Sequence, residues 1–404
     1  EYAGALERQD RAEHWGRGTL SRSAADRLYG RRVAMSASRM DKYRSCHFAY
    51  FMRYGLKAEP RRQAGFSAPA YGTFVHYVLE QVMQDEMFQQ TRLPGMEPDF
   101  EDRERAHLAD LTRAAVERYT REELGGLEGQ SERFQYLFRR LLRSVQAVVE
   151  NVAQELLSGS FKPISFELGF GRKGDLPPVE VTVDGVTISV SGFVDRVDGW
   201  EHDGRLYLRV VDYKTGSKKL DLKEVYCGLD CQMLLYLFSL TRDAGGRFTG
   251  AQPAGVLYLL ADPAPQTLPR GQAARAVEYQ LDGLVRDEQK IFDAMDADET
   301  GKYLPFGYRN GAPSPYQKDK RADSAKLSRI QLHLDDLVTQ MGEQLYGGQI
   351  DAEPLVVSSS KSPCTWCDYS FICCHETGVH ERALEAPAKP FEPEEEPEEE
   401  EEQP

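Results

Sequence analysis

Residues 192–214 constrain what this chain can fold into more than any other stretch. They read G-F-V-D-R-V-D, then a polar turn between Gly199 and Gly204, then R-L-Y-L-R-V-V-D-Y-K. Apolar and β-branched residues fill both runs, and turns that contain glycine bound them. This pattern predicts two strands joined by a short connection.

A carboxylate ends the first predicted strand, and an Asp-x-Lys triplet ends the second. They are Asp195 and Asp212-Tyr213-Lys214. Because side chains alternate along a strand, Asp212 and Lys214 share one face, and Tyr213 points the other way. An isolated triplet of this kind is more often a turn with a solvated lysine. Two neighbouring strands that end this way favour a site for a hard divalent cation and a phosphate oxygen.

The charge of the chain is concentrated at its C-terminal end. The 404 residues carry a net charge of −15, but nine glutamates from Glu392 onward leave only −6 on the rest. A body so close to balance can hold a local basic groove, so composition does not exclude nucleic acid as a partner. Hydrophobic content of 41% is typical of a globular protein. No apolar run reaches the length of a membrane span, and we expect a cytoplasmic location with no membrane partner.

Hydrophobic periodicity predicts an α/β fold. We expect helices at 36–55 (with Cys46 in the middle), 71–89, 99–123, 131–157, 222–241 and 324–346. We expect strands at 163–170, 178–183, 186–197, 205–212 and 254–260, the last of them buried.

Residues 1–34 are expected to be a helical lead-in from a missing upstream region, since the chain begins with Glu rather than Met. The main folded body is expected at 35–380, with a loop-rich insertion at 262–320 that holds one helix near 282–297. Residues 387–404 are expected to be a disordered acidic tail.

Three cysteines lie close together near the C-terminal end, and their spacing predicts a metal site. The segment 362–375 reads S-P-C-T-W-C-D-Y-S-F-I-C-C-H, which gives Cys364-x2-Cys367-x5-Cys373. Cys46 is the candidate fourth ligand, although it lies more than 300 residues upstream. Zinc and an iron–sulfur cubane both accept four thiolates, and His375 could replace one of them on zinc. Cys374 leaves the identity of the third ligand open. Cys227 and Cys231 are interpreted as small buried residues.

Two further pairs of residues lie at helical spacing. His76 shares a helix face with Glu80, and Gln232 shares one with Tyr236. Taken alone, each pair has an ordinary interpretation, namely a boundary histidine, a boundary glutamine and a core tyrosine.

Taken in order, these motifs resemble those of a known nuclease family. The set Gly72-x3-His76, Gly192-x2-Asp195-Arg196-x-Asp198, Asp212-x-Lys214 and Gln232-x3-Tyr236 is similar to the RecB-type branch of the PD-(D/E)xK nucleases. The split cysteine set resembles the iron–sulfur subgroup of that branch. Within that branch, the motifs resemble the C-terminal nuclease domains of AddB-type subunits of bacterial AddAB helicase–nucleases, and the resemblance runs from about residue 20 to 376.

The resemblance implies a restriction-endonuclease-like core, a small mixed sheet flanked by helices, with helical additions and an iron–sulfur staple. It implies that Mg²⁺ or Mn²⁺ is bound by His76, Asp195, Asp212 and the Tyr213 carbonyl. Lys214 would position or polarise the attacking water, and Gln232 and Tyr236 would help to place the DNA backbone. Cys46, Cys364, Cys367 and Cys373 would hold a [4Fe–4S] cluster.

The leading hypothesis is a metal-dependent DNA nuclease domain of a helicase–nuclease complex. It would cut single strands, and by resemblance the 5′-terminated strand, during recombinational repair of double-strand breaks beside an AddA-type subunit. The alternative is a catalytically silent subunit that binds DNA and guides a strand. A stand-alone iron–sulfur exonuclease is a third, weaker option. The intact set of His76, Asp195, Asp212 and Lys214 favours the enzyme.

Overall fold

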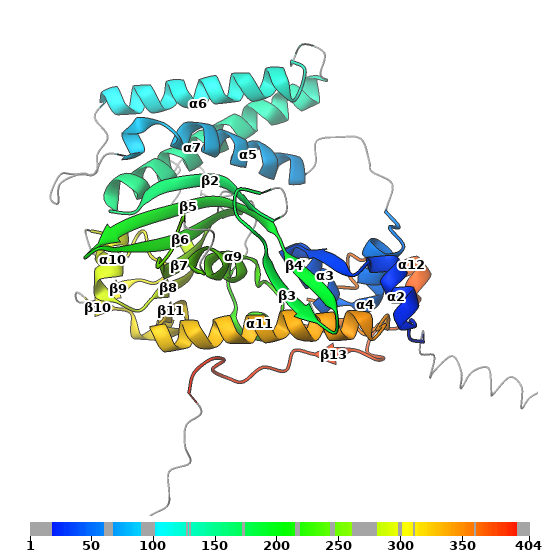
Figure 1. Ribbon diagram of the computed structural model, residues 1–404. Coiled ribbons are helices and arrows are strands. Elements are labelled where there is room, and N and C mark those ends of the chain that lie inside the picture. The colour runs from blue at the N-terminus through cyan, green and yellow to red at the C-terminus, as the bar shows by residue number, and fades with distance from the viewer. Residues whose placement is uncertain are drawn as a thin grey trace, which may run out of the picture.

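The computed structural model describes residues 18–59, 68–89, 102–126, 128, 131–171, 174–214, 219–242, 247–260, 281–297, 301–309, 312–358 and 361–393. Its centre is a six-stranded mixed sheet (Figure 1). The strand order is β11 (Arg321–Ala322), β8 (Leu281–Arg286), β7 (Gln252–Leu260), β6 (Arg205–Lys214), β5 (Gly192–His202) and β2 (Lys162–Phe170). The β6–β7 and β8–β11 pairs are parallel, and the other pairs are antiparallel.

The β5–β6 hairpin forms because a two-residue turn suits its sequence. The last strand pair is His202 with Arg205, so only Asp203 and Gly204 form the turn. Both have positive φ, 51° and 70°. Asp-Gly is a favoured sequence for a type I′ turn, whose twist matches that of the flanking strands. The predicted pair of strands is therefore confirmed, but the turn is shorter than the stretch 199–204.

Helices cover both faces of the sheet (Figure 1). One face carries a layer of α5 (Ala68–Met83), α6 (Asp102–Glu122) and α7 (Glu132–Ser158). On the other face lies α9 (Gln232–Thr241), and α11 (Ser324–Tyr346) packs against α9. The buried residues form one large apolar cluster on each side of the sheet. The predicted α/β fold class is thus confirmed.

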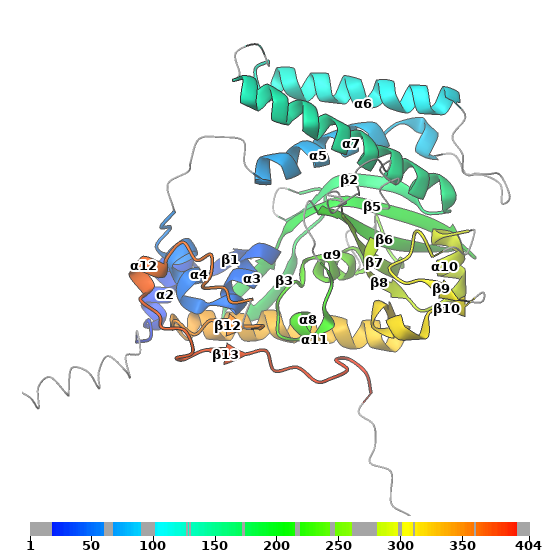
Figure 2. The same ribbon diagram turned by 180° about the vertical axis from the view of Figure 1, so that it is seen from behind.

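A smaller lobe joins the two ends of the chain, as the view from behind shows (Figure 2). It contains α2 (Arg22–Tyr29), α3 (Ala37–Ser45), α4 (His47–Tyr50), a π-helical turn (Phe51–Gly55) and the short C-terminal α12 (Ser370–Cys373). A second sheet, in the order β1 (Arg32–Met35), β4 (Val186–Val190) and β3 (Val179–Val183), lies beside it. The remaining short elements are α8 (Leu222–Tyr226), α10 (Gln289–Met295), β9 (Tyr308–Arg309), β10 (Ala312–Pro313), β12 (Leu355–Val356), β13 (Arg382–Ala383) and the 3₁₀ turns Glu86–Gln89 and Pro315–Lys320.

The structure adds detail at two of the expected domain boundaries. The boundary expected after residue 34 falls inside the fold, because β1 pairs with β4 and α2 packs on α11. The loop-rich insertion expected at 262–320 contains β8, a strand of the main sheet, and the helix there covers only Gln289–Met295. Residues 1–17 and 261–280 lie outside the described residues.

Three local expectations also need correction. The helix expected at 36–55 is broken at Cys46, whose φ of −167° and ψ of 119° are extended. The helix expected at 222–241 is divided into α8 and α9, with Asp230 between them at a φ of 54°. Residues 387–393 of the expected disordered tail are ordered, because Phe391 is only 8% exposed and packs against Tyr226 and His333. The rest of that tail, 394–404, lies outside the described residues. Of the helices in the described ranges, none is both long and apolar enough to cross a membrane.

Candidate functional site

The predicted site residues on α5, β5 and β6 converge at the open end of the hairpin. His76 lies with Nε2 2.7 Å from the carbonyl oxygen of Tyr213 and Nδ1 3.4 Å from Oδ2 of Asp195. The same Asp195 oxygen accepts the backbone N–H of Tyr213 at 3.0 Å. One carboxylate therefore ties β5 to β6 and also orients the helix-borne imidazole.

Asp212 and Lys214 lie on one face of β6, as strand alternation predicts. Nζ of Lys214 is 2.6 Å from Oδ2 of Asp212. The Asp212 side chain is buried, with 5% of its surface exposed, and the lysine remains one-quarter exposed. The ammonium is thus held at the strand end with one side open to solvent.

Glu167 on β2 completes this group, and sequence reasoning missed it. Strand pairing places Glu167 across from Asp195, between the pairs Phe166–Arg196 and Leu168–Val194. Glu167 has a φ of 43°, which is uncommon for a side-chain-bearing residue inside a strand. Ligand atoms of His76, Glu167 and Asp195 lie within 4.8 Å of one another. We call His76, Glu167, Asp195, Asp212, Lys214 and the Tyr213 carbonyl the carboxylate centre.

The electrostatics of the carboxylate centre show an excess of crowded negative charge. Burial and the charge of Asp195 raise the pKa of Glu167 to about 7. Burial and Asp195 also raise the pKa of Asp212 to about 6, although Lys214 opposes this. Burial alone would lower the pKa of His76, but the hydrogen bond and charge of Asp195, helped by the Tyr213 carbonyl, raise it to about 9. A protonated imidazole therefore occupies a place suited to a cation.

This set of donors fits a divalent metal ion. Carboxylate and carbonyl oxygens with one imidazole are suitable ligands for Mg²⁺ or Mn²⁺. Both ring nitrogens of His76 face acceptors, so a metal ion would replace a ring proton and relieve the repulsion between Glu167 and Asp195. Asp212, a predicted ligand, is held by Lys214 and is not among the three residues whose ligand atoms lie within 4.8 Å of one another.

Tyr236, one of the two predicted DNA-binding residues, is buried beside the centre, whereas the other, Gln232, is half-buried. Tyr236 is 4% exposed, and its hydroxyl accepts a hydrogen bond from Nε2 of Gln232 at 3.4 Å. A Cβ on Gly192 would lie 2.4 Å from that hydroxyl, so only glycine fits where β5 begins. The geometry makes Tyr236 a support for β5.

A fully buried network of charges lies beneath strands β5 and β6. Arg196 and Arg209 are 0% and 1% exposed, and both bind Asp198 and Glu155, the latter from α7. Arg196 also donates to the Tyr213 hydroxyl at 3.2 Å. Two cations and two anions balance, which satisfies charges that would be costly to bury singly. Asp198, part of the motif G-F-V-D-R-V-D, thus belongs to the scaffold beneath the carboxylate centre.

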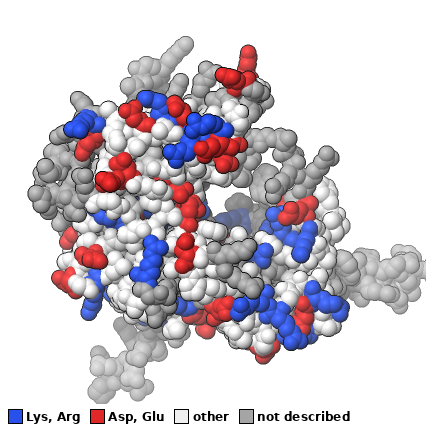
Figure 3. All heavy atoms as spheres, turned by 45° about the horizontal axis from the view of Figure 1, so that its top comes forward, with Lys and Arg blue, Asp and Glu red and all other residues white. Residues whose placement is uncertain are grey.

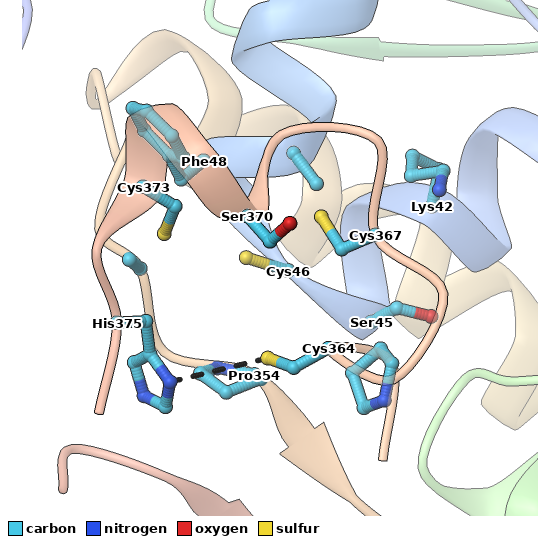
Figure 4. Close-up of a pocket in the computed structure, with 13 residues that line it drawn as sticks. Lys42, Ser45, Cys46, Phe48, Pro354, Cys364, Cys367, Ser370, Cys373 and His375 are labelled. Carbon is cyan, nitrogen blue, oxygen red and sulfur yellow. Dashed lines mark hydrogen bonds between the residues drawn. The ribbon is translucent and has the colours of Figure 1, made fainter. Parts of the chain in front are cut away.

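The four predicted cysteine ligands surround one pocket in the smaller lobe. Cys46, Cys364, Cys367 and Cys373 line it together, and their sulfurs point inward (Figure 4). The break at Cys46 places this residue between α3 and α4 instead of inside a helix. Burial raises the pKa of Cys46, and the neighbouring thiols of Cys373 and Cys367 raise it further. We call these four residues the thiol pocket.

The geometry of the thiol pocket also distinguishes the cysteine doublet. Cys373 is 8% exposed and lines the pocket, whereas Cys374 is exposed and has a left-handed φ of 51°. His375 lies at the rim, with Nδ1 3.9 Å from Sγ of Cys364 and Nε2 2.7 Å from the carbonyl oxygen of Val379 (Figure 4). Four thiols around one pocket supply the donor set of a tetrathiolate site. No three of these described sulfurs lie within 4.8 Å of one another, a spacing wider than a single metal ion needs.

Charges are mixed on one face of the molecule. On the face seen in Figure 3, Lys and Arg side chains alternate with Asp and Glu side chains over the described residues.

Comparisons with known proteins agree with the resemblance expected from the motifs. A family model described as the PD-(D/E)XK nuclease superfamily matches residues 34–374. Relatives from Bacillus subtilis (strain 168), Thermoanaerobacter sp. (strain X514) and Clostridium tetani (strain Massachusetts / E88) are all named as the B-type subunit of an ATP-dependent helicase/deoxyribonuclease. They are 33%, 30% and 29% identical over 90%, 87% and 87% of this chain. The chain spans 31%, 30% and 31% of their respective lengths, a little under a third of each.

Proposed function

This chain belongs to the PD-(D/E)XK nuclease superfamily, and on that premise we propose that it is a divalent-metal-dependent deoxyribonuclease. Its reaction is hydrolysis of phosphodiester bonds in single-stranded DNA, from a strand end. The carboxylate centre carries the proposal, because His76, Asp195 and the Tyr213 carbonyl converge beside the Lys214–Asp212 pair. Phosphodiester hydrolysis needs a nucleophilic water and neutralisation of the charge that develops on the phosphate oxygens.

His76, Asp195 and the Tyr213 carbonyl would hold Mg²⁺ or Mn²⁺, with Asp212 and Glu167 as further oxygen donors. The ion, when bound, supplies an activated water and positive charge at the phosphate. Lys214 adds a second positive charge, and its contact with Asp212 fixes the ammonium at the end of β6. Asp195 orients His76 and also restrains the peptide N–H of Tyr213. The buried Arg196 holds the Tyr213 side chain on the far side of the sheet.

The names of the relatives support a wider proposal. The chain acts as the nuclease domain of a helicase–nuclease complex, in the cytoplasm, beside an AddA-type subunit in a heterodimer. It receives a single strand from unwound duplex and cuts the 5′-terminated strand during recombinational repair of double-strand breaks. The nuclease domain runs from about residue 20 to about residue 392, because α2 and Phe391 pack within it.

The thiol pocket holds a [4Fe–4S] cluster with Cys46, Cys364, Cys367 and Cys373 as its ligands. The support is the convergence of four thiols from the two ends of the chain. The cluster acts as a structural link between the N-terminal helices and the C-terminal segment.

The test is a cleavage assay on end-labelled single-stranded DNA with and without Mg²⁺ or Mn²⁺. Asp212→Asn keeps the shape of the side chain but removes its charge, and we expect cleavage to fall by about 100-fold or more. Asp203→Asn is the matched control, because Asp203 is 85% exposed in a turn that accepts Asn-Gly equally well.

The label also reports which end is cut. Loss of cleavage in Asp212→Asn, with Asp203→Asn unchanged, supports the enzyme. A metal-supplied wild-type protein that binds DNA but never cuts it contradicts the proposal and favours a silent subunit that guides a strand.

A further inference from the structure

Phe193 is an exposed aromatic residue within a strand whose neighbours are mostly buried. Its side chain is 64% exposed, while Val194 beside it is 1% exposed. Among the described residues of β5, no other large hydrophobic side chain is exposed. A phenylalanine exposed to this extent keeps roughly 100 Å² or more of apolar surface in contact with water, which a ligand could cover.

The backbone around Phe193 is shaped to hold this ring. Phe193 pairs with Gly169 on β2, and a Cβ at Gly169 would lie 3.0 Å from Cε1 of the ring. Glycine at position 169 therefore lets the ring rest against the neighbouring strand. From the other side, the Tyr236 hydroxyl fills the space over Gly192, the residue before Phe193. The ring is thus carried on a segment that is fixed from both sides.

The ring lies next to the carboxylate centre. Asp195 is two residues after Phe193 on β5, and Glu167 is two residues before Gly169 on β2. Two residues along a strand correspond to about 7 Å, so the ring lies about one pleat repeat from the carboxylates. A strand with its phosphate at the centre would bring a neighbouring base within reach of this ring.

We propose that Phe193 is a stacking subsite for one nucleobase of the bound DNA strand; this rests on the proposed nuclease function. The predicted DNA contacts are Gln232 and Tyr236, but Tyr236 is buried and supports the segment that carries Phe193. A single ring matches a single base. It is far smaller than the apolar patch of several hundred Å² that a protein partner would need.

Stacking on Phe193 would give the site a preference for single-stranded over double-stranded DNA. A base in a duplex already has partners on both faces, so only an unpaired base can lie against the ring. Every base has a π face, and therefore the subsite selects single-stranded DNA without selecting sequence. The binding class is an unpaired nucleobase beside the scissile phosphodiester.

The experiment measures cleavage kinetics of the full 404-residue chain on single-stranded oligothymidylate. Phe193→Ala is expected to raise KM about tenfold, as loss of one base–aromatic stack does. Phe193→Trp should restore the wild-type KM, whereas Phe193→Leu, which is apolar but lacks a π face, should not. Tyr136→Ala is the matched control: Tyr136 is 66% exposed on α7 and lies about 28 Å along that helix from Glu155, which contacts Arg196.

An abasic substrate separates stacking from any general effect of the substitution. Oligonucleotides with one abasic residue at successive positions should include one that costs the wild type about tenfold in KM but costs Phe193→Ala almost nothing. Equal losses in both proteins at every position, or an unchanged KM in Phe193→Ala, would overturn the inference.

The two proposals can fail separately. If the wild type cuts and Phe193→Ala cuts equally well, only the stacking subsite is lost. If the wild type never cuts, the nuclease proposal fails, and the same oligonucleotides are then compared by equilibrium binding. In that assay, stacking is still supported if Phe193→Ala binds the intact strand tenfold more weakly than the wild type does but binds the abasic strand equally well. Equal affinities of the two proteins for the intact strand reject it.

Discussion

The carboxylate centre takes its side chains from regular secondary structure, whereas the thiol pocket takes them from short segments at opposite ends of the chain. In the carboxylate centre, Asp195 restrains Tyr213 and His76, and Lys214 restrains Asp212, by contacts within the protein. In the thiol pocket, Cys46 lies at a helix break, and the other three thiols lie on turns and on the four-residue α12. A metal should therefore change mainly the charge of the carboxylate centre, whereas at the thiol pocket it should hold the two segments together.

This difference indicates what the free energy of metal binding would do at each of the two sites. The hydrogen bonds of the carboxylate centre keep its shape without a cation, so a bound ion mainly changes charge and chemistry. The thiols of Cys46 and Cys364, whose pKa is raised by burial, would have to lose protons to bind a metal, and the bonds to it would link segments more than 300 residues apart. The binding free energy of such a site contributes to the folding free energy.

The largest expected effect is the loss of one thiol ligand. Cys367→Ser should lose the cluster iron and lower the free energy of unfolding by about 5 kcal/mol, the value expected for opening a closed loop of hundreds of residues. Iron analysis and denaturant unfolding measure both quantities. Cys374→Ser is the control, because that thiol is exposed and lies outside the pocket. Loss of iron in Cys374→Ser instead would reassign the ligand.

The next effect tests whether the scaffold under the carboxylate centre is stable without metal. Glu155→Gln removes the charge that faces Arg196 and Arg209 in a region with almost no solvent. We expect the free energy of unfolding to fall by about 3–5 kcal/mol, because a buried cation is left without its partner. Chemical denaturation in a chelator of divalent ions gives the value. Glu150→Gln, on the exposed face of the same helix, should change it by less than about 0.5 kcal/mol.

Glu167→Gln asks whether the residue that sequence reasoning missed acts as a donor to the metal. The substitution keeps the side chain's size and removes its charge, so we expect Mn²⁺ to bind about tenfold more weakly. Titration calorimetry on the iron-loaded protein measures this, and the iron content should not change. Glu180→Gln serves as the comparison, since Glu180 forms a surface ion pair with Arg32 away from this centre. Equal Mn²⁺ affinity in Glu167→Gln and the wild type would exclude Glu167 as a donor.

The smallest effect is a pH dependence that arises from His76. The folded pKa of about 9 lies above the ordinary value of 6.5, so this group's contribution to stability is complete below pH 6.5 and is lost as the pH rises through 9. Without divalent metal, we expect it to contribute about 1–2 kcal/mol. The measurement is the difference in unfolding free energy between the wild type and His76→Gln at about pH 6 and at about pH 9.5, on either side of that window. A difference that stays constant with pH would contradict the proposed imidazolium.

The sequence predicted the parts of the site that are encoded in local spacing. Asp212 and Lys214 share a face because strand alternation requires it, and their contact is observed at 2.6 Å. The convergence of His76 with Asp195 came from the family motif, since nothing local in the sequence relates a helix at residue 76 to a strand at residue 195. The chemical roles of these residues remain predictions.

Features that depend on tertiary packing could not be predicted from the sequence. Glu167 is one acidic residue in an ordinary strand, and its importance comes from pairing opposite Asp195. Strand β8 reads L-D-G-L-V-R, and its Asp and Gly have a low propensity for strands. It forms a strand because it pairs with β7. Phe391 is the one aromatic residue in the Pro- and Glu-rich tail, and it is the residue from which anchoring of the tail could have been suspected.

The position of the thiol pocket in the chain also fixes an order of events during protein synthesis. Cys46 emerges early from the ribosome, but the pocket is incomplete until Cys373 has been added. At about 5–20 residues per second, the more than 300 intervening residues take roughly 15–65 s. All six members of the carboxylate centre, the last of which is Lys214, are translated within that interval. All residues of the carboxylate centre are therefore synthesised before the thiol pocket is complete.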